Sequence, residues 1–388
     1  MSEQSETPND NAAPQAIAID ACEEDVCELP GASTTGPTSL RIDPDISLSD
    51  DDPEAFLDFA EAQGWGDGLP LIPPTPERVD RVLAQLPASV DPDEVIATLP
   101  PRGGIVTRRV LAVNAVMAGC RPETLPVLTT AIRALARPEI NLRGVNATTH
   151  PVAPLVIVHG EAVNALGFNA GLGAFGPGNR ANATVGRAVR LSLLNVAGAR
   201  PGAGDASTQG QPSKFSYCVA ENTPESPGSW EAYPASRGLD SASAVTVTCG
   251  ENPHNVQDHD CLSATQTAEQ IASVMATLGS NNAPVSSAEW FVFLGPEHAA
   301  TFADEGWSRK DVQAFLYEHA ALPMAAYRRA FKVVQYADWE HELPDSAMKP
   351  IARDPDLIRV MVTGGAGKHS CVVPSWGMTA SVTLALED

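Results

Sequence analysis

Apolar residues recur at strand-like or helical spacing along most of the chain after residue 50. The run at 155–158 is short, wholly apolar and bounded by Pro154 and Gly160, which is typical of a buried strand. Across 123–136 the apolar residues recur at helical spacing and predict a helix. By the same criteria, strands are predicted at 94–99, 215–220, 244–248, 290–294, 357–363 and 381–386, and helices at 52–65, 107–119, 181–196, 267–278, 297–304 and 309–320.

This alternation of strands and helices predicts an α/β protein with two lobes, each a mixed sheet with flanking helices. We expect the lobes to cover residues 51–240 and 241–388. Residues 1–50 are rich in Ser, Thr, Pro, Asp and Glu, and their small apolar surface predicts a disordered acidic tail. Within this tail, Cys22 and Cys27 are interpreted as a redox pair, a metal clip or two thiols kept unreactive by neighbouring carboxylates.

Composition and charge narrow the classes of function. The 388 residues carry a formal net charge of −23, and 43% of them are hydrophobic. An acidic chain without basic clusters repels phosphate backbones and anionic lipids, which argues against nucleic-acid and membrane partners. Residues 1–15 have neither a basic nor an apolar stretch, which predicts no secretory signal and a cytoplasmic location. The seven cysteines include no CxxC pair, which predicts mostly free thiols in a reducing compartment.

A glycine-rich stretch at 167–180 leads into a predicted helix and is the first candidate for chemistry. Arg180, Asn182 and Arg187 follow at the helix start, where backbone N–H groups and two guanidinium groups can hold a carboxylate or phosphate of a substrate. Residues 171–176 match GxGxxG, but a proline and a glycine intervene before the helix. The acidic ribose ligand expected about 20 residues later is also missing, which disfavours a dinucleotide site. Turn chemistry alone is the alternative.

Two cysteines are candidate nucleophiles. In a strand over 215–220, Cys218 shares a face with Lys214, whose ammonium would lower the pKa of the thiol and hold an anionic substrate. Glu221 stands at the end of this strand, where active sites of α/β proteins usually lie. Cys120 precedes an arginine and the start of a helix, a position that favours the thiolate. The alternative for both cysteines is burial in the core.

The segment 249–261 follows a predicted strand and is the third candidate. It contains two Cys, two His, two Asp and one Glu, a density that suits a Zn²⁺ or Fe²⁺ site or an acid–base cluster. His254 and His259 are the candidate proton carriers. The spacing matches no closed metal motif, so a solvated loop remains an alternative and no metal ligand is assigned.

The glycine turn at 364–371 is the fourth candidate. It resembles part of a phosphate loop, but His369 stands where that loop requires Ser or Thr, so ATP hydrolysis is not expected. The backbone N–H groups around Gly365, Gly367 and Lys368 can still hold a carboxylate, with His369 moving a proton. A tight turn without chemistry is the alternative.

Three segments resemble a known group of proteins. These are GWGDGLPLIPPT at 64–75, NAVMAGCRPE at 114–123, and the GKHS close at 367–370. They are similar to an uncharacterised bacterial family that is frequent in environmental genomes and sometimes labelled thiol–disulfide-related or selenoprotein-associated. The resemblance spans about residues 55–385 and implies thiol chemistry. It implies no mechanism and assigns no catalytic residue.

The sequence therefore predicts a cytosolic enzyme that acts on a small anionic organic substrate. A cysteine thiolate would serve as nucleophile or redox centre and a histidine would transfer the proton, as in a thiol-dependent oxidoreductase or lyase. One alternative is a metal-dependent lyase or hydrolase that uses the cluster at 254–261. A second is a non-catalytic carrier of a small ligand or metal. No motif requires a cofactor, and the sequence leaves open whether a homo-oligomer or a second subunit completes the site.

Overall fold

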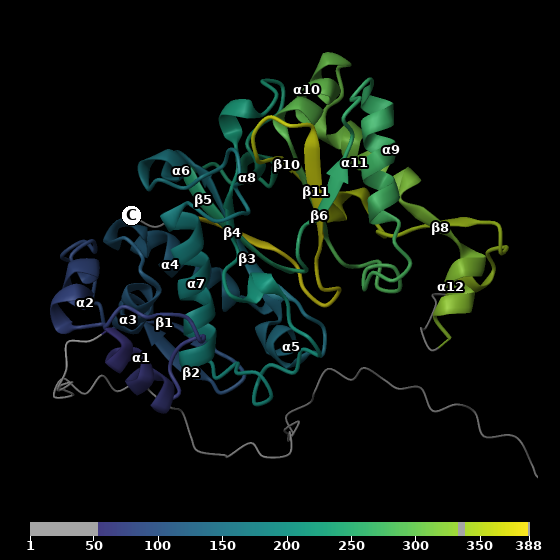
Figure 1. Cartoon of the computed structure of the whole chain (residues 1–388). Helices are drawn as coiled ribbons and strands as arrows, with labels where there is room; N and C mark the ends of the chain where they lie inside the picture. Colours follow the sequence, from purple (N-terminus) through teal and green to yellow (C-terminus); the bar gives the residue numbers. More distant parts are fainter. Residues whose placement is uncertain (1–52, 333–337, 387–388) are drawn as a thin grey trace, which may run out of the picture.

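The computed structural model of the protein describes residues 53–332 and 338–386, and it confirms an α/β fold built on two four-stranded sheets (Figure 1). The predicted tail, with Cys22 and Cys27, lies outside the described residues. Within the described ranges, no helix is both long and apolar enough to span a bilayer.

The first sheet has the strand order β12-β5-β3-β4. Its strands are β3 (Ala153–Gly160), β4 (Cys218–Ala220), β5 (Ser243–Gly250) and β12 (Val382–Ala385). β3 runs parallel to β4 and antiparallel to β5, and β12 adds antiparallel to the far side of β5. The sheet therefore takes strands from both sides of residue 240. The helices of its core are α3 (Arg108–Ala118), α4 (Leu125–Leu135) and α7 (Arg180–Asn195).

The second sheet has the strand order β10-β7-β11-β6. Its strands are β6 (His254–Gln257), β7 (Trp290–Leu294), β10 (Ile358–Val362) and β11 (His369–Pro374). β10 and β7 are parallel, whereas β11 is antiparallel to both of its neighbours. The helices of its core are α9 (Ala264–Met275), α10 (Pro296–Asp304) and α11 (Arg309–His319).

The two sheets pack face to face, with helices on the outer side of each (Figure 1). Strand alternation produces this arrangement, because successive side chains point to opposite faces. Leu155 and Ile157 of β3 meet Phe291 and Phe293 of β7 in a core between the sheets. The intervening side chains of β3 pack on the helices instead. Both faces of these strands are covered, which explains why the runs at 155–158 and 290–294 are apolar throughout.

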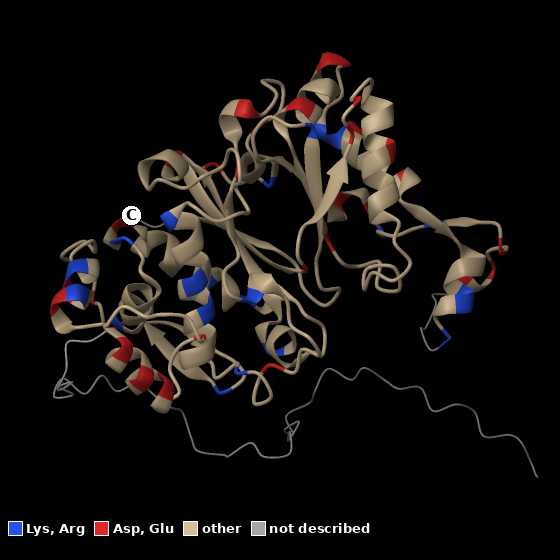
Figure 2. Ribbon diagram, viewed as in Figure 1, with Lys and Arg blue, Asp and Glu red and all other residues tan. Residues whose placement is uncertain are grey.

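Smaller elements surround the two sheets. β1 (Val95–Leu99) and β2 (Gly104–Thr107) form one antiparallel pair, and β8 (Ala321–Pro323) and β9 (Met348–Pro350) form another. The remaining helices are α1 (Pro53–Ala62), α2 (Pro76–Leu83), α5 (Leu142–Ala147), α6 (Glu161–Ala165), α8 (Tyr233–Ser236), α12 (Met324–Ala330) and α13 (Asp338–His341). Acidic and basic side chains are interspersed over these elements, and no continuous basic face is visible in this view (Figure 2).

Two sequence expectations differ from the structure. The strand predicted at 215–220 begins only at Cys218, because Pro212–Lys214 form a 3₁₀ turn that leads into it. Conversely, His254–Gln257 and His369–Pro374 are strands in segments that the sequence assigns to loops. In the strand His254–Gln257 only Val256 is buried, so its sequence has no apolar pattern from which this edge strand could be predicted.

The strands β4, β7 and β10 end close to one another. The N–H of Asn222, just after β4, donates to the carbonyl of Val362 at the end of β10 (2.8 Å). The N–H of Thr363 donates to the carbonyl of Leu294 at the end of β7 (2.9 Å). We call this the carboxyl edge. In α/β folds such an edge gathers the loops that carry chemistry.

Candidate functional site

The third and fourth sequence candidates form a single site at the carboxyl edge. β11 pairs with β6 so that His369 lies opposite Gln257 and Ser370 opposite Val256. The loop that leaves β6 therefore lies beside the glycine turn that enters β11. Helix α10 starts directly after β7 at the same edge and adds a third segment.

Asp258, Cys261 and His298 form what we call the inner cluster. One ligand atom of each lies within 4.8 Å of the others. Asp258 and His298 are buried, and Cys261 is half-buried. A carboxylate, a thiol and an imidazole together are the donor types that bind Zn²⁺ or Fe²⁺.

Asp258 is held in its ionised form. Its Oδ2 accepts a hydrogen bond from Thr267 Oγ1 (2.8 Å), and its Oδ1 accepts from Gln266 Nε2 (3.0 Å) and from the N–H of Cys261 (3.1 Å). Burial by itself raises the pKa of this carboxyl, but the three donors outweigh burial and lower the pKa below its ordinary value.

His298 is fixed from both sides of its ring. Nδ1 lies 2.8 Å from Ser370 Oγ, and Nε2 lies 3.2 Å from the carbonyl oxygen of Asp258. Burial lowers the pKa of this imidazole and therefore favours the neutral ring, which is the form that binds metals. Since a carbonyl oxygen only accepts, Nε2 carries the proton of the neutral ring and donates it, while the lone pair of Nδ1 faces Ser370.

Cys261 is brought to the cluster by an unusual backbone conformation. Its φ is +48°, in the left-handed region that side chains other than glycine and asparagine rarely adopt. The thiol lies 2.7 Å from Thr301 Oγ1 on α10. Strained conformations of this kind concentrate at functional sites and cost about 1–3 kcal/mol each.

The glycine turn already holds a carboxylate that belongs to the chain itself. The N–H groups of Gly367 and Lys368 donate to Glu297 Oε2 (2.5 and 2.6 Å), and these two bonds lower the pKa of that carboxyl. The Nζ of Lys368 donates to the carbonyl of His259 (2.9 Å). The turn does have the predicted anion-binding geometry, but Glu297 takes the place expected for a substrate.

Gly365 serves close packing. A Cβ at this position would lie 2.4 Å from the Cγ of Leu172 and 2.9 Å from its backbone nitrogen. The N–H of Gly364 also donates to the carbonyl of Ala170 (2.7 Å). The turn at 364–368 and the glycine-rich loop of the first lobe therefore lie directly against each other.

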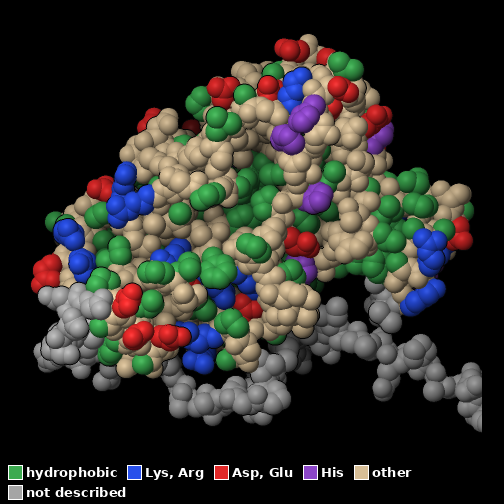
Figure 3. Space-filling view, viewed as in Figure 1, with side chains coloured by type: hydrophobic (Ala, Val, Ile, Leu, Met, Phe, Trp, Pro, Cys, Tyr) green, Lys and Arg blue, Asp and Glu red, His purple; other side chains and the backbone are tan. Residues whose placement is uncertain are grey.

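His259 and His369, which we call the histidine pair, stand at the rim of this site. Their Nε2 atoms are 3.1 Å apart, and the rings meet edge to face with centroids 4.9 Å apart. Both side chains are exposed. Figure 3 shows several histidine side chains at the surface of this lobe. His254 begins β6 and pairs with Val372, so the strand separates it by about 10 Å from the loop that carries the inner cluster.

The cations of the first sequence candidate bind groups of the chain. Arg187 Nε and Nη2 donate to the two carboxylate oxygens of Asp67 (both 2.8 Å), and Arg180 Nε donates to the carbonyl of Gly119 (2.8 Å). The amide of Asn182 accepts from the N–H of Asn169 (2.8 Å) and donates to its carbonyl (2.9 Å). These residues shape the glycine-rich loop, and the structure does not bring them into the inner cluster.

The two predicted nucleophiles lie in the core between the first sheet and its helices. Burial raises the pKa of Cys120 to about 11 and raises that of Cys218 further. The prediction that Lys214 lowers the pKa of Cys218 is wrong, because the lysine lies in the 3₁₀ turn and its Nζ binds both oxygens of Asp205 (2.8 and 2.7 Å).

Glu221 is buried between the two sheets. Its Oε2 lies 2.7 Å from His159 Nδ1, and its Oε1 accepts from the N–H of Tyr233 (3.0 Å). The other ring nitrogen of His159 lies 2.8 Å from Thr246 Oγ1. Each of these three polar side chains is at most 1% exposed, so the network satisfies polar groups within the core.

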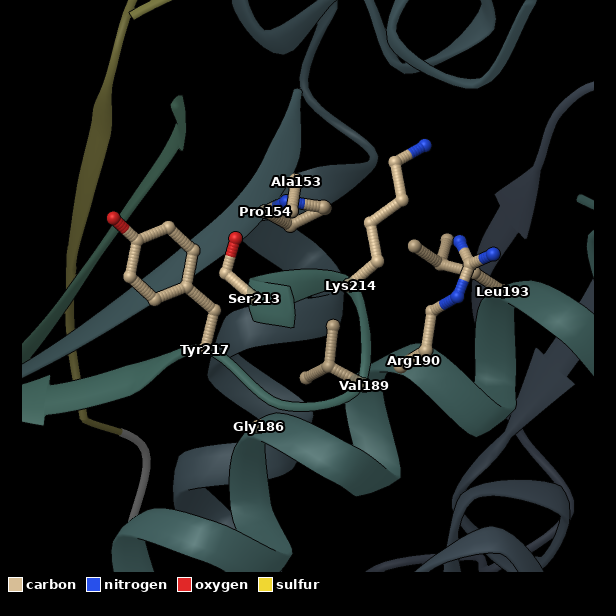
Figure 4. A pocket seen from close by; sticks show the side chains of 9 residues that line it. All are labelled: Ala153, Pro154, Gly186, Val189, Arg190, Leu193, Ser213, Lys214 and Tyr217. Atoms are coloured by element: carbon tan, nitrogen blue, oxygen red, sulfur yellow. The ribbon is translucent and has the colours of Figure 1, made fainter. Parts of the chain in front are cut away.

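A pocket beside α7 lies at the start of β3, at the end away from the carboxyl edge (Figure 4). Arg190, Lys214, Ser213 and Tyr217 line it together with apolar side chains. Its cavity of about 10 Å³ has room for about one water molecule. Asp205 binds both Arg190 and Lys214, so the two cations that line the pocket are paired within the chain.

His298 is the residue of the inner cluster that the sequence analysis does not single out. It follows a buried strand by four residues and lies in the first turn of α10. This position after a strand is the signal that could have found it.

No protein-family profile, curated protein or solved structure matches this chain.

Proposed function

We propose that this protein is a metal-dependent lyase or hydrolase that acts on a small organic substrate. Asp258, Cys261 and His298 are the proposed metal ligands. The observation that carries the proposal is the convergence of three different donor types within 4.8 Å at the carboxyl edge. Surface acidic groups often cluster without a metal, but this cluster is largely buried and includes an imidazole and a thiol.

The protonation states of the cluster suit a divalent ion. The carboxyl of Asp258 is ionised and the ring of His298 is neutral, whereas the thiol of Cys261 would release its proton when the ion binds. Three protein ligands leave a fourth position for water, whose pKa a catalytic zinc ion lowers to about 7. Mixed nitrogen, oxygen and sulfur donors favour Zn²⁺ or Fe²⁺ over Mg²⁺ or Ca²⁺.

Neighbouring side chains supply the outer contacts that such a site needs. Thr267 and Gln266 orient Asp258, and Ser370 orients His298. At the rim, the exposed imidazoles of His259 and His369 would move protons to and from a substrate when no ion holds them.

Metal analysis of tag-free purified protein tests the proposal. We expect about one equivalent of zinc or iron, and Cys261→Ser should lower it to less than about a tenth of an equivalent. Cys371→Ser is the matched control, since that half-buried cysteine lies outside the cluster, and it should leave the metal content unchanged. Wild-type protein with less than about a tenth of an equivalent, before and after incubation with Zn²⁺ or Fe²⁺, would overturn the proposal.

A second candidate is thiol–imidazole catalysis without a metal. Cys261 lies near His298, whereas burial raises the pKa of the other four described cysteines. This function predicts turnover that survives a chelator and is lost in Cys261→Ser. The metal-dependent function predicts turnover that a chelator abolishes and the ion restores.

A further inference from the structure

The histidine pair has the geometry of a two-ligand chelate. Two imidazole nitrogens bound to one Zn²⁺ at tetrahedral angles lie about 3.3 Å apart, and at a right angle they lie about 2.9 Å apart. The observed Nε2–Nε2 distance of 3.1 Å falls between these values. The two nitrogens can therefore bind one ion with little movement.

The ring orientations agree with this interpretation. Two imidazoles on a shared ion place their centroids about 4.5–5.2 Å apart for the same range of angles. Two rings that meet head-on at a 3.1 Å separation of their nitrogens would place the centroids about 5.4 Å apart. The observed 4.9 Å is shorter than the head-on value and lies within the range for two imidazoles on one ion.

The backbone holds both histidines in place before any ion binds. His369 is paired with Gln257 in the sheet, and Lys368 Nζ donates to the carbonyl of His259. Glu297 fixes the turn that precedes His369. Because the backbone at both positions is held in advance, only the two side chains have to be ordered on chelation.

Charge and access are also favourable. Both imidazoles are exposed. The negative charge of Glu297 interacts with Lys368 and offsets part of the positive charge of that lysine. Imidazole ligands suit Cu²⁺, Ni²⁺ and Zn²⁺, whereas Mg²⁺ and Ca²⁺ prefer oxygen.

We infer that His259 and His369 form a second, surface site for a divalent late transition-metal ion, separate from the inner cluster. The site uses different ligand atoms from the inner cluster. It therefore forms whether or not Asp258, Cys261 and His298 bind a metal. Two protein ligands leave further positions on the ion open for water or for a donor group of a substrate.

Calorimetric titration of tag-free protein with Ni²⁺ tests this inference. His259→Ala and His369→Ala should each weaken binding at this site at least tenfold. His254→Ala is the matched control, an exposed histidine on the adjoining strand, and it should leave the affinity unchanged. On addition of Zn²⁺, the ring ¹⁵N spectrum should shift the Nε2 signals of His259 and His369 together.

The outcomes separate this site from the inner cluster. Binding that survives Cys261→Ser but is lost in either histidine variant supports the surface site, even if the inner cluster binds no metal. Wild-type affinity in both histidine variants would overturn the inference, as would the absence of Ni²⁺ binding to the wild type. Because both side chains are exposed, the variants should fold, and circular dichroism checks that they do.

Discussion

Glu289 is a buried carboxylate that ties the second sheet to the edge of the first. Its Oε1 accepts from Arg359 Nε (2.9 Å), Arg359 Nη2 (2.7 Å) and Ser381 Oγ (2.9 Å), and its Oε2 accepts from the N–H of Ser381 (2.7 Å). Ser381 directly precedes β12, so the carboxylate bridges the two sheets. Its side chain is 1% exposed and that of Arg359 is 10% exposed.

Glu289→Ala should lower the free energy of unfolding by about 3–5 kcal/mol, because it leaves the guanidinium of Arg359 buried without its counter-charge. Glu289→Gln keeps the shape of the side chain and one acceptor oxygen with its two lone pairs. We expect it to lower the free energy of unfolding by about 1.5–3 kcal/mol. Combining Glu289→Ala with Arg359→Met should cost at least about 1 kcal/mol less than the sum of the single variants, since no unpaired charge remains.

Urea denaturation followed by circular dichroism and tryptophan fluorescence measures these differences. The control is Asp93→Asn, which breaks an exposed ion pair with Arg109 and should cost at most about 1 kcal/mol. A loss below about 1 kcal/mol in Glu289→Ala, or full additivity with Arg359→Met, would refute the reasoning that Glu289 and Arg359 stabilise each other as a buried ion pair.

Three further predictions follow from individual contacts. The pKa of Asp205 is lowered because hydrogen bonds from Lys214 and Ser207 outweigh the opposing effect of burial. The stabilisation from Asp205 should therefore be complete above its unfolded-state pKa of about 3.9 and lost as the pH falls through the lower folded-state value. Acid denaturation should show this loss in the wild type and not in Asp205→Asn. Limiting iodoacetamide at pH 7 should label Cys261 at least tenfold faster than Cys120, since burial raises the pKa of Cys120 to about 11, and peptide mass spectrometry that finds equal rates would contradict this. Glu297→Ala should speed hydrogen exchange at the amides of 367 and 368, whereas unchanged protection would show that the turn keeps its shape without the carboxylate.

Local sequence patterns determined the main layers of this protein. The apolar runs at 155–158 and 290–294 predicted β3 and β7, because strands covered on both faces show continuous hydrophobicity. The helix predicted at 309–320 is α11, and Ser308 forms a complete capping box at its start. These features depend on residues that are close together in sequence, so the sequence alone reveals them.

The composition of the site was decided by the tertiary structure. The segments at 249–261 and 364–371 were recognised as separate candidates, but only the pairing of His369 with Gln257 makes them neighbours. The structure also gives two residues partners that the sequence did not predict. Glu297 accepts the hydrogen bonds of the glycine turn, and Lys214 binds Asp205 and not the region of Cys218.

The physical reason is that these contacts join residues far apart in the chain. Asp258 and His298 meet because β6, β11 and β7 lie side by side and α10 starts at the end of β7. Strand register and the burial that follows from it set each distance and each pKa shift in the site, and neither is encoded in the spacing of nearby residues. The sequence determined which chemical groups are available, and the packing of the two sheets decided which of them meet.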